Sequence, residues 1–177
     1  MIGAFPGTQL CNHGFSYSPD VVSRLKWVFL LYRLPRNPST PRISLWRSLR
    51  RLGVVQLVDG LVALPLDART KEQLEWLADE VTDAGGEASI WTAEAGSAAQ
   101  ERSLAARMAE AVAAEYRAVG AAALAARSAT VSSRRRTLRR LRRDLRAIRA
   151  RDYFPPPEAA EARRAVESLA EALEATA

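Results

Sequence analysis

The stretch VVQLVDGLVAL, residues 54–64, decides the fold. Two runs of apolar, β-favouring residues flank the dipeptide Asp59-Gly60. This dipeptide is the strongest short hairpin signal, because both central positions of a type I′ turn need a positive φ. Pro65 follows the second run and ends it, since proline has no N–H to donate to a neighbouring strand. The stretch therefore predicts a pair of antiparallel strands.

A strand and a helix are predicted before this hairpin. The unbroken apolar run WVFLLY, residues 27–32, is typical of a strand, and its two apolar faces lead us to expect that both are covered. Thr40 is a good N-cap, and Pro41 then occupies the first helical position, where its missing N–H costs nothing. Leucines at helical spacing follow and predict a helix that ends at Gly53.

A second helix and a fourth strand are predicted after the hairpin. The residues from Thr70 to Gln73 have the pattern of a capping box, and an amphipathic stretch follows that ends at Gly85-Gly86. Residues 87–92 then form the last predicted strand. The resulting order, β-α-β-β-α-β over residues 25–94, is the ferredoxin-like pattern. We expect residues 1–24, which have no periodicity, to be a disordered tail.

Each of the four tryptophans falls on a different predicted element. They are Trp27, Trp46, Trp76 and Trp91. We interpret them as core anchors, because Trp46 and Trp76 adjoin the apolar stripes of their helices. The alternative is a set of rings on which nucleobases stack.

Residues 97–177 are rich in alanine and predict helices. One long helix starts this region, and a polar break at residues 130–133 separates it from a second helix that is covered by arginine apart from an apolar seam with 3-4-3 spacing. The seam residues are Leu138, Leu141, Leu145 and Ile148. Three prolines at 155–157 end this helix, and a last amphipathic helix follows. The predicted class is therefore α+β: a ferredoxin-like βαββαβ domain followed by an antiparallel appendage of about three helices.

The charge is unevenly distributed along the 177 residues. The chain has 26 basic and 20 acidic residues, and 24 of the basic residues are arginine. Residues 134–151 hold ten arginines and one acid, a net of +9, and residues 24–51 hold eight basic residues and no acid. Such asymmetry favours a nucleic acid or another polyanion as partner. The alternative is an Arg–Glu lattice with the last helix, but the net charge of that helix, −3, cannot neutralise +9.

Ten arginines are candidate contacts to such an anion. Arginine is always charged and binds phosphate-like oxygens bidentately, and steps of three or four residues bring several guanidinium groups to one side of a helix. Binding through several of them would depend strongly on salt. The candidates are Arg42, Arg47, Arg50 and Arg51 in the first helix and Arg135, Arg139, Arg142, Arg143, Arg146 and Arg149 in the arginine-rich helix.

Residues for catalysis and metal binding are scarce. The single Cys11 excludes an internal disulfide, and the single His13 excludes two-His metal sites and leaves no credible base for a Ser-His-Asp triad. We therefore expect neither a metal nor a cofactor. No apolar run reaches the ~18 residues of a membrane span, and no signal-peptide pattern is present. These observations predict a cytoplasmic protein that does not bind membranes.

Several separate segments resemble, in order, the N-terminal region of the chromate-resistance regulator ChrB. They are WVFLLYRLPR (27–36), WRSLRRLG (46–53), LP (64–65), LEWL (74–77), GGEA (85–88) and IRARDYF (148–154). The resemblance covers residues 27–173 and implies a transcriptional regulator of a chromate-efflux operon. The usual length of the family includes a further C-terminal domain that is associated with the chromate response, and we expect that domain to be absent here.

The first half of the chain also resembles, more weakly, the Cas2-like domain of the phenylacetate-type repressors. In Cas2 nucleases a metal-binding aspartate ends the first strand, whereas Arg33 stands near that place in this sequence. A cation there would repel a metal ion. Similarity of fold therefore argues against nuclease activity, and we expect the chain not to be an enzyme.

Two functional hypotheses follow. The first is a non-enzymatic, DNA-binding transcriptional regulator linked to chromate resistance. The alternative is a protein-interaction or oxyanion-sensing module, whose arginines bind chromate or an acidic protein surface and which works with a separate C-terminal partner. We also expect that the chain can form a homodimer through its sheet, because both faces of the first strand are apolar. The alternative is that the helical appendage covers the same surface.

Overall fold

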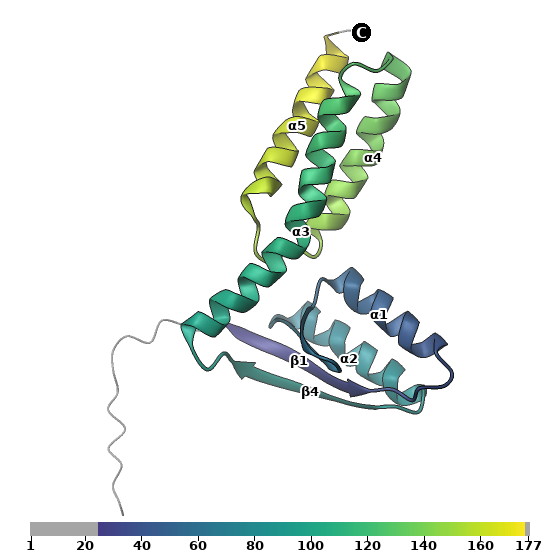
Figure 1. The fold of residues 1–177 in the computed structure, drawn as a ribbon, viewed down its shortest axis with the longest axis vertical. Helices are drawn as coiled ribbons and strands as arrows, with labels where there is room; N and C mark the ends of the chain where they lie inside the picture. Colours follow the sequence, from purple (N-terminus) through teal and green to yellow (C-terminus); the bar gives the residue numbers. More distant parts are fainter. Residues whose placement is uncertain (1–24, 176–177) are drawn as a thin grey trace, which may run out of the picture.

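The computed structural model describes residues 25–175, which form a four-stranded sheet, two helices packed on it and a bundle of three longer helices (Figure 1). The nine elements among these residues are β1 (Lys26–Arg33), α1 (Thr40–Leu52), β2 (Val55–Val58), β3 (Leu61–Pro65), α2 (Ala68–Asp83), β4 (Glu87–Glu94), α3 (Ala98–Ala126), α4 (Val131–Arg149) and α5 (Pro157–Glu174). The fold class is α+β, as the sequence predicts.

The sheet is antiparallel throughout, with the strand order β2-β3-β1-β4. Helices α1 and α2 pack against each other on one face of the sheet (Figure 1). Val28 and Leu30 of β1 and Leu64 of β3 are fully buried in the core that forms there, together with Leu74 of α2. The apolar residues of β1 therefore build the core that joins the sheet to its helices.

The predicted hairpin is present as β2 and β3, but its turn differs from the prediction. Gly60 has a φ of 79°, whereas no described residue other than glycine has a positive φ. Asp59 therefore does not adopt the type I′ conformation. The strand register also shifts between Gln56 and Val58, which leaves Leu57 without a partner across the hairpin. The extra residue in β2 bends this strand and increases the local twist of the hairpin.

Helix α1 begins one residue earlier than predicted. Thr40 is its first residue, and the N-cap is Ser39, whose side chain makes no capping hydrogen bond. Pro41 lies in the first turn, where the sequence places it. The helix ends at Gly53, which has a φ of 73° and whose N–H donates to the carbonyl of Arg50 at 3.2 Å.

The capping box of α2 lies three residues before the predicted one. Asp67 is the N-cap, and its carboxylate accepts a hydrogen bond from the N–H of Thr70 at 2.7 Å. The hydroxyl of Thr70 in turn accepts one from the N–H of Asp67 at 2.9 Å. The predicted box from Thr70 to Gln73 is therefore wrong. Thr70 is the third residue of the helix (N3) in the observed box, whereas the prediction made it the N-cap.

Only one of the four tryptophans is a core residue. Trp27 is fully buried and stacks on Phe154, with 6.0 Å between the ring centroids. Trp46, Trp76 and Trp91 are 53%, 62% and 63% exposed, so their interpretation as core anchors is wrong. Trp46 and Trp76 each adjoin a buried leucine in sequence, but adjacent residues point about 100° apart on a helix. Trp91 lies opposite Phe29 in the register, on the face of the sheet away from α1 and α2.

That second face of the sheet is partly open. Pairing in the register places Phe29 opposite Trp91, Leu31 opposite Leu61, and Leu61 opposite Val58, so these five side chains share one face. We call them the open sheet face. Leu31, Val58 and Trp91 are exposed there. The expectation that both faces of the first strand are covered is therefore wrong for this part of the sheet.

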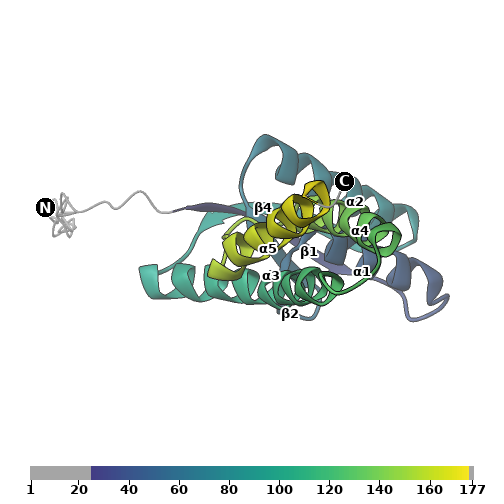
Figure 2. The same ribbon diagram turned by 90° about the horizontal axis from the view of Figure 1, so that it is seen from above.

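The helix α3 belongs to both halves of the structure. Near its start, Leu104 and Met108 are buried in the core of the sheet, whereas Val112, Tyr116 and Val119 are buried among α4 and α5. The helix α4 runs antiparallel to α3 and α5, and all three pack against one another (Figure 1). Seen from above, the first part of α3 extends beyond α4 and α5 on the side where β1 begins (Figure 2).

Residues 150–154, between α4 and α5, attach the bundle to the sheet, and we call them the junction turn. The hydroxyl of Tyr153 donates to the carbonyl of Leu52 at 3.1 Å, and Arg69 of α2 donates to the carbonyl of Ala150 at 2.8 Å. Gly53 lies directly against this turn: a Cβ at that position would be 2.8 Å from the carbonyl oxygen of Arg151. Only a residue without a side chain fits there.

The substitution Gly53→Ala is expected to destabilise the protein more than Gly85→Ala. The two glycines have nearly the same φ, 73° and 75°, so alanine costs about 1–2 kcal/mol of conformational strain at either position. A Cβ at Gly85 meets nothing within 4 Å, whereas one at Gly53 displaces the junction turn. Urea unfolding of both variants measures the difference. Equal reductions of the unfolding free energy would show that the contact with Arg151 does not constrain the fold.

Candidate functional site

The helix α4 presents most of its arginines to solvent. Its N-cap is Thr130, whose hydroxyl accepts from the N–H of Ser133, and the helix continues to Arg149. Leu138, Leu141 and Ile148 of the predicted seam are buried, and Leu145 is half-buried. The seam therefore packs into the bundle, and the opposite sides of the helix carry the charge. The six candidates on this helix are all exposed: Arg135, Arg139, Arg142, Arg143, Arg146 and Arg149.

These arginines do not form the alternative Arg–Glu lattice with α5. Within residues 25–175, no ion pair joins an arginine of α4 to a glutamate. Glu158 of α5 instead pairs with Arg117 of α3, at 2.7 Å. A hydrogen bond to its own backbone N–H and the guanidinium of Arg117 lower the pKa of Glu158. The positive charge of α4 is thus left without acidic partners inside the described fold.

Three of the α4 arginines line one groove. Arg142, Arg146 and Arg149 surround it together with Arg163 of α5, and we call it the arginine groove. Its volume is about 460 Å³. Arg163 was not a candidate from the sequence, because its proximity to α4 depends on how α5 packs across the bundle. By contrast, Arg135, Arg139 and Arg143 lie along α4 outside this groove.

Tyr116 and Asp152 form the floor of the same region, where α3 meets the junction turn. Both residues line the arginine groove, and the hydroxyl of Tyr116 donates to the carboxylate of Asp152 at 2.8 Å. The pKa of Tyr116 is raised to about 12, mainly by burial of the hydroxyl and secondly by this hydrogen bond. The other carboxylate oxygen of Asp152 is buried and has no hydrogen-bond partner among the described residues.

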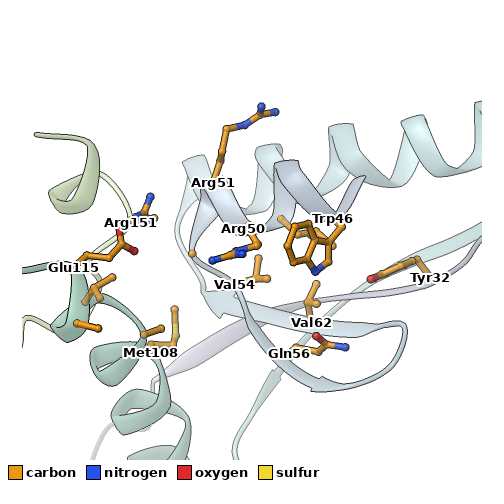
Figure 3. A pocket seen from close by; sticks show the side chains of 15 residues that line it. Tyr32, Trp46, Arg50, Arg51, Val54, Gln56, Val62, Met108, Glu115 and Arg151 are labelled. Atoms are coloured by element: carbon orange, nitrogen blue, oxygen red, sulfur yellow. Dashed lines mark hydrogen bonds and ion pairs between the residues drawn. The ribbon is translucent and has the colours of Figure 1, made fainter. Parts of the chain in front are cut away.

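Two of the four candidate arginines of α1, Arg50 and Arg51, line a different groove. Its volume is about 560 Å³, and it runs between α1, the β2–β3 hairpin and α3 (Figure 3). Arg50 stacks over the ring of Trp46 at 4.8 Å, and Figure 3 shows this tryptophan between Arg50 and Tyr32. Arg51 also lines the groove, and its guanidinium donates to the hydroxyl of Ser48 at 2.9 Å.

The structure does not join the two arginine sets into one cavity. No arginine of α4 lines the α1 groove. Arg151 of the junction turn does, and it forms an ion pair with Glu115 of α3 (Figure 3). Arg42 donates to the carbonyl of Pro35 at 2.7 Å, and Arg47 is exposed. Neither of these two lines the α1 groove. Each set therefore forms its own basic surface.

The described residues contain neither a metal-binding cluster nor a membrane-spanning helix. No group of three or more His, Cys, Asp or Glu side chains in residues 25–175 is arranged to hold a metal ion. None of the helices in this range is long and apolar enough to cross a membrane. Cys11 and His13 lie outside the described residues, as does the predicted tail.

Comparison with known families supports the resemblance found in the sequence. Residues 42–125 match the family model described as Protein ChrB, N-terminal, which confirms the resemblance for this part of the chain. The matched segment runs from α1 almost to the end of α3 and does not include α4. Comparisons with curated proteins and with solved structures gave no match.

Alkaline pH is expected to destabilise the protein through Tyr116. Its pKa of about 12 in the folded state exceeds the ordinary value of 10.0, so the folded state binds the phenol proton more tightly than the unfolded state. This stabilisation is complete below pH 10 and disappears as the pH rises through about 12. Urea unfolding at a series of pH values measures that decrease.

The variant Tyr116→Phe isolates the contribution of this tyrosine. Its stability should fall less between pH 10 and 12 than that of the unmodified protein, although burial also raises the pKa of Tyr32 and Tyr153. An identical alkaline decrease in the variant would contradict the assignment.

Proposed function

We propose that this chain is a DNA-binding transcriptional regulator linked to chromate resistance and that it acts without enzymatic activity. One observation carries the proposal: α4 presents a row of exposed arginines that have no acidic partner within residues 25–175. The match of residues 42–125 to the ChrB N-terminal family supports a protein related to chromate resistance. A cytoplasmic location is part of the same proposal.

The physical chemistry of arginine supports contact with DNA phosphates. A guanidinium stays charged at every physiological pH and forms two parallel hydrogen bonds to a phosphate. A guanidinium that has no ion pair in the free protein can bind a phosphate without first losing another partner. Each phosphate that is neutralised releases condensed counterions, so several such contacts give an affinity that is strong at low salt and falls steeply as salt rises.

The arginines of α1 extend this proposal to a second surface. Arg42, Arg47, Arg50 and Arg51 line the exposed side of α1, and Arg50 lies over the exposed ring of Trp46. An aromatic ring beside cations resembles the surfaces on which bases of single strands stack. The alternative role of Trp46, as a ring on which nucleobases stack, is therefore supported by its exposure.

We also assign the sheet and its first two helices to the ferredoxin-like class. The support is the element order β1-α1-β2-β3-α2-β4 together with the strand order β2-β3-β1-β4 and two helices on one face. The three remaining helices would then be an appendage that carries the arginines. This division is the one predicted from the sequence, with regions of residues 25–94 and 97–177.

A homodimer through the open sheet face is a further part of the proposal. Leu31, Val58 and Trp91 are exposed on one face, which is an arrangement typical of protein interfaces. A second copy of the chain would bury the same residues, because a twofold interface uses one patch on both subunits. It would also double the number of arginines available to DNA.

One observation supports the alternative, an oxyanion-binding module that works with a separate C-terminal partner. Three α4 arginines share a groove with Arg163, which lies outside the exposed row on α4. A groove of this kind suits a small anion as well as the backbone of a nucleic acid. Chromate is one candidate oxyanion.

Replacing Arg139 and Arg143 by glutamine is expected to weaken binding to DNA from the chain's own upstream region. Both side chains are exposed on α4 and lie outside the arginine groove. The dependence of log affinity on log salt should become shallower by about 0.9 for each phosphate that the variant no longer neutralises. Electrophoretic shifts from about 50 mM salt upward measure this slope.

The matched control replaces Arg102 of α3 and Arg164 of α5, which are also exposed, by glutamine and so removes the same two charges. It should keep the original slope. The DNA-binding proposal fails if no DNA is bound at the lowest salt, or if both double variants weaken binding equally.

The substitution Trp91→Glu is expected to convert a dimer to a monomer. A carboxylate on the open sheet face would be desolvated by the second copy, at a cost that a well-packed apolar interface cannot offset. Light scattering measures the mass. Trp76→Glu is the control, since this tryptophan of α2 is equally exposed but lies away from that face. A monomeric unmodified protein, or dissociation by both substitutions, would refute the interface.

A further inference from the structure

The arginine groove has a composition that favours an anionic ligand. Four guanidinium groups line it, from Arg142, Arg146, Arg149 and Arg163, and Asp152 supplies one carboxylate, which leaves a net charge of +3. Among residues 25–175, none of these four arginines forms an ion pair or a side-chain hydrogen bond. The carboxylate of Asp152 is itself engaged by Tyr116. The groove therefore carries three positive charges in excess of its single carboxylate, and none of its arginines is held in an ion pair.

The groove is longer than a single tetrahedral oxyanion. Arg142, Arg146 and Arg149 lie on successive turns of α4, so their attachment points span about 10 Å along the helix axis. Arg163 contributes from α5, on the other wall. A volume of about 460 Å³ also falls within the range of small-molecule sites. An anion with several charged groups in a row fits this arrangement better than one with a single charged centre.

We propose that the arginine groove binds a small polyphosphate, a molecule with a chain of two or more phosphate groups. Successive phosphates would each accept bidentate hydrogen bonds from a guanidinium, with Arg163 closing the groove from the side opposite α4. The apolar walls provided by Leu145, Pro155 and Ala159 leave room for an uncharged portion of an organic polyphosphate.

Occupancy of the groove would also regulate DNA binding, and this part rests on the proposed function. Arg142, Arg146 and Arg149 belong to both the groove and the exposed row on α4. A polyphosphate bound to them would compete with the DNA backbone for the same guanidinium groups. The ligand would therefore lower DNA affinity without any change in the fold.

Binding is tested on the full chain in the absence of DNA. Titration calorimetry is carried out with inorganic tripolyphosphate, pyrophosphate, orthophosphate and sulfate, all at one ionic strength. The affinity should fall in the order tripolyphosphate, pyrophosphate, orthophosphate, because fewer arginines are engaged, and sulfate should bind no better than orthophosphate. Equal affinity for all four anions, or no binding of tripolyphosphate, would overturn the proposal.

Two neighbouring arginines provide the matched pair of variants. Arg163 lines the groove, whereas Arg164 is equally exposed but lies outside it. Arg163→Gln should weaken tripolyphosphate binding about tenfold, as expected when one charge-assisted hydrogen bond is removed, and Arg164→Gln by less than about twofold. If the two substitutions weakened binding equally, the binding would reflect general charge attraction, and the assignment to this groove would be overturned. If Arg163→Gln fails to fold, Arg146→Gln replaces it with the same expected result.

A competition experiment separates this inference from the proposed function. Tripolyphosphate should lower DNA affinity in the unmodified protein and less so in Arg163→Gln, because Arg163 is not among the candidate DNA contacts. If the protein binds tripolyphosphate but no DNA, the proposed function is refuted and the polyphosphate site is supported. If it binds DNA but not tripolyphosphate, the groove proposal alone fails.

Discussion

The close approach of the junction turn to the end of α1 determines where the arginines lie. Gly53 has no side chain, so the carbonyl of Arg151 can approach its Cα directly. Tyr153 adds a hydrogen bond to the carbonyl of Leu52, and Phe154 stacks on the buried Trp27. Arg69 of α2 adds a hydrogen bond to the carbonyl of Ala150, the first residue of the same turn. The segment RDYF, residues 151–154 of the junction turn, therefore has a structural role: it holds the bundle against the core of the sheet.

The packing of the bundle explains why its charge stays available. Leu138, Leu141 and Ile148 attach α4 to α3 and α5 by apolar burial, so no arginine is needed for an ion pair across the bundle. The glutamate nearest to the start of α5, Glu158, is already paired with Arg117. Folding and anion binding thus use different sides of one helix, and changes to the exposed side cost little stability.

Local patterns predicted much of the fold, whereas the site depended on tertiary packing. The hairpin, the glycine stop of α1 and the apolar seam of α4 follow from residues that lie close together in the chain, and the structure contains all three. The burial of Trp46 was predicted wrongly because adjacency to a stripe differs from membership in it by about 100° of helix rotation. Arg163 was missed for another reason: its position beside α4 depends on the packing of α5, which no local pattern contains.

The continuity of α3 has a consequence for how the molecule unfolds. Leu104 and Met108 belong to one core and Val112 and Tyr116 to the other, and they lie on successive turns of the same unbroken helix. Melting either core would fray the helix that the other core needs, because helix formation is cooperative along its length. The stabilities of the two cores are therefore coupled, and the sheet and the helical bundle should unfold in one concerted transition.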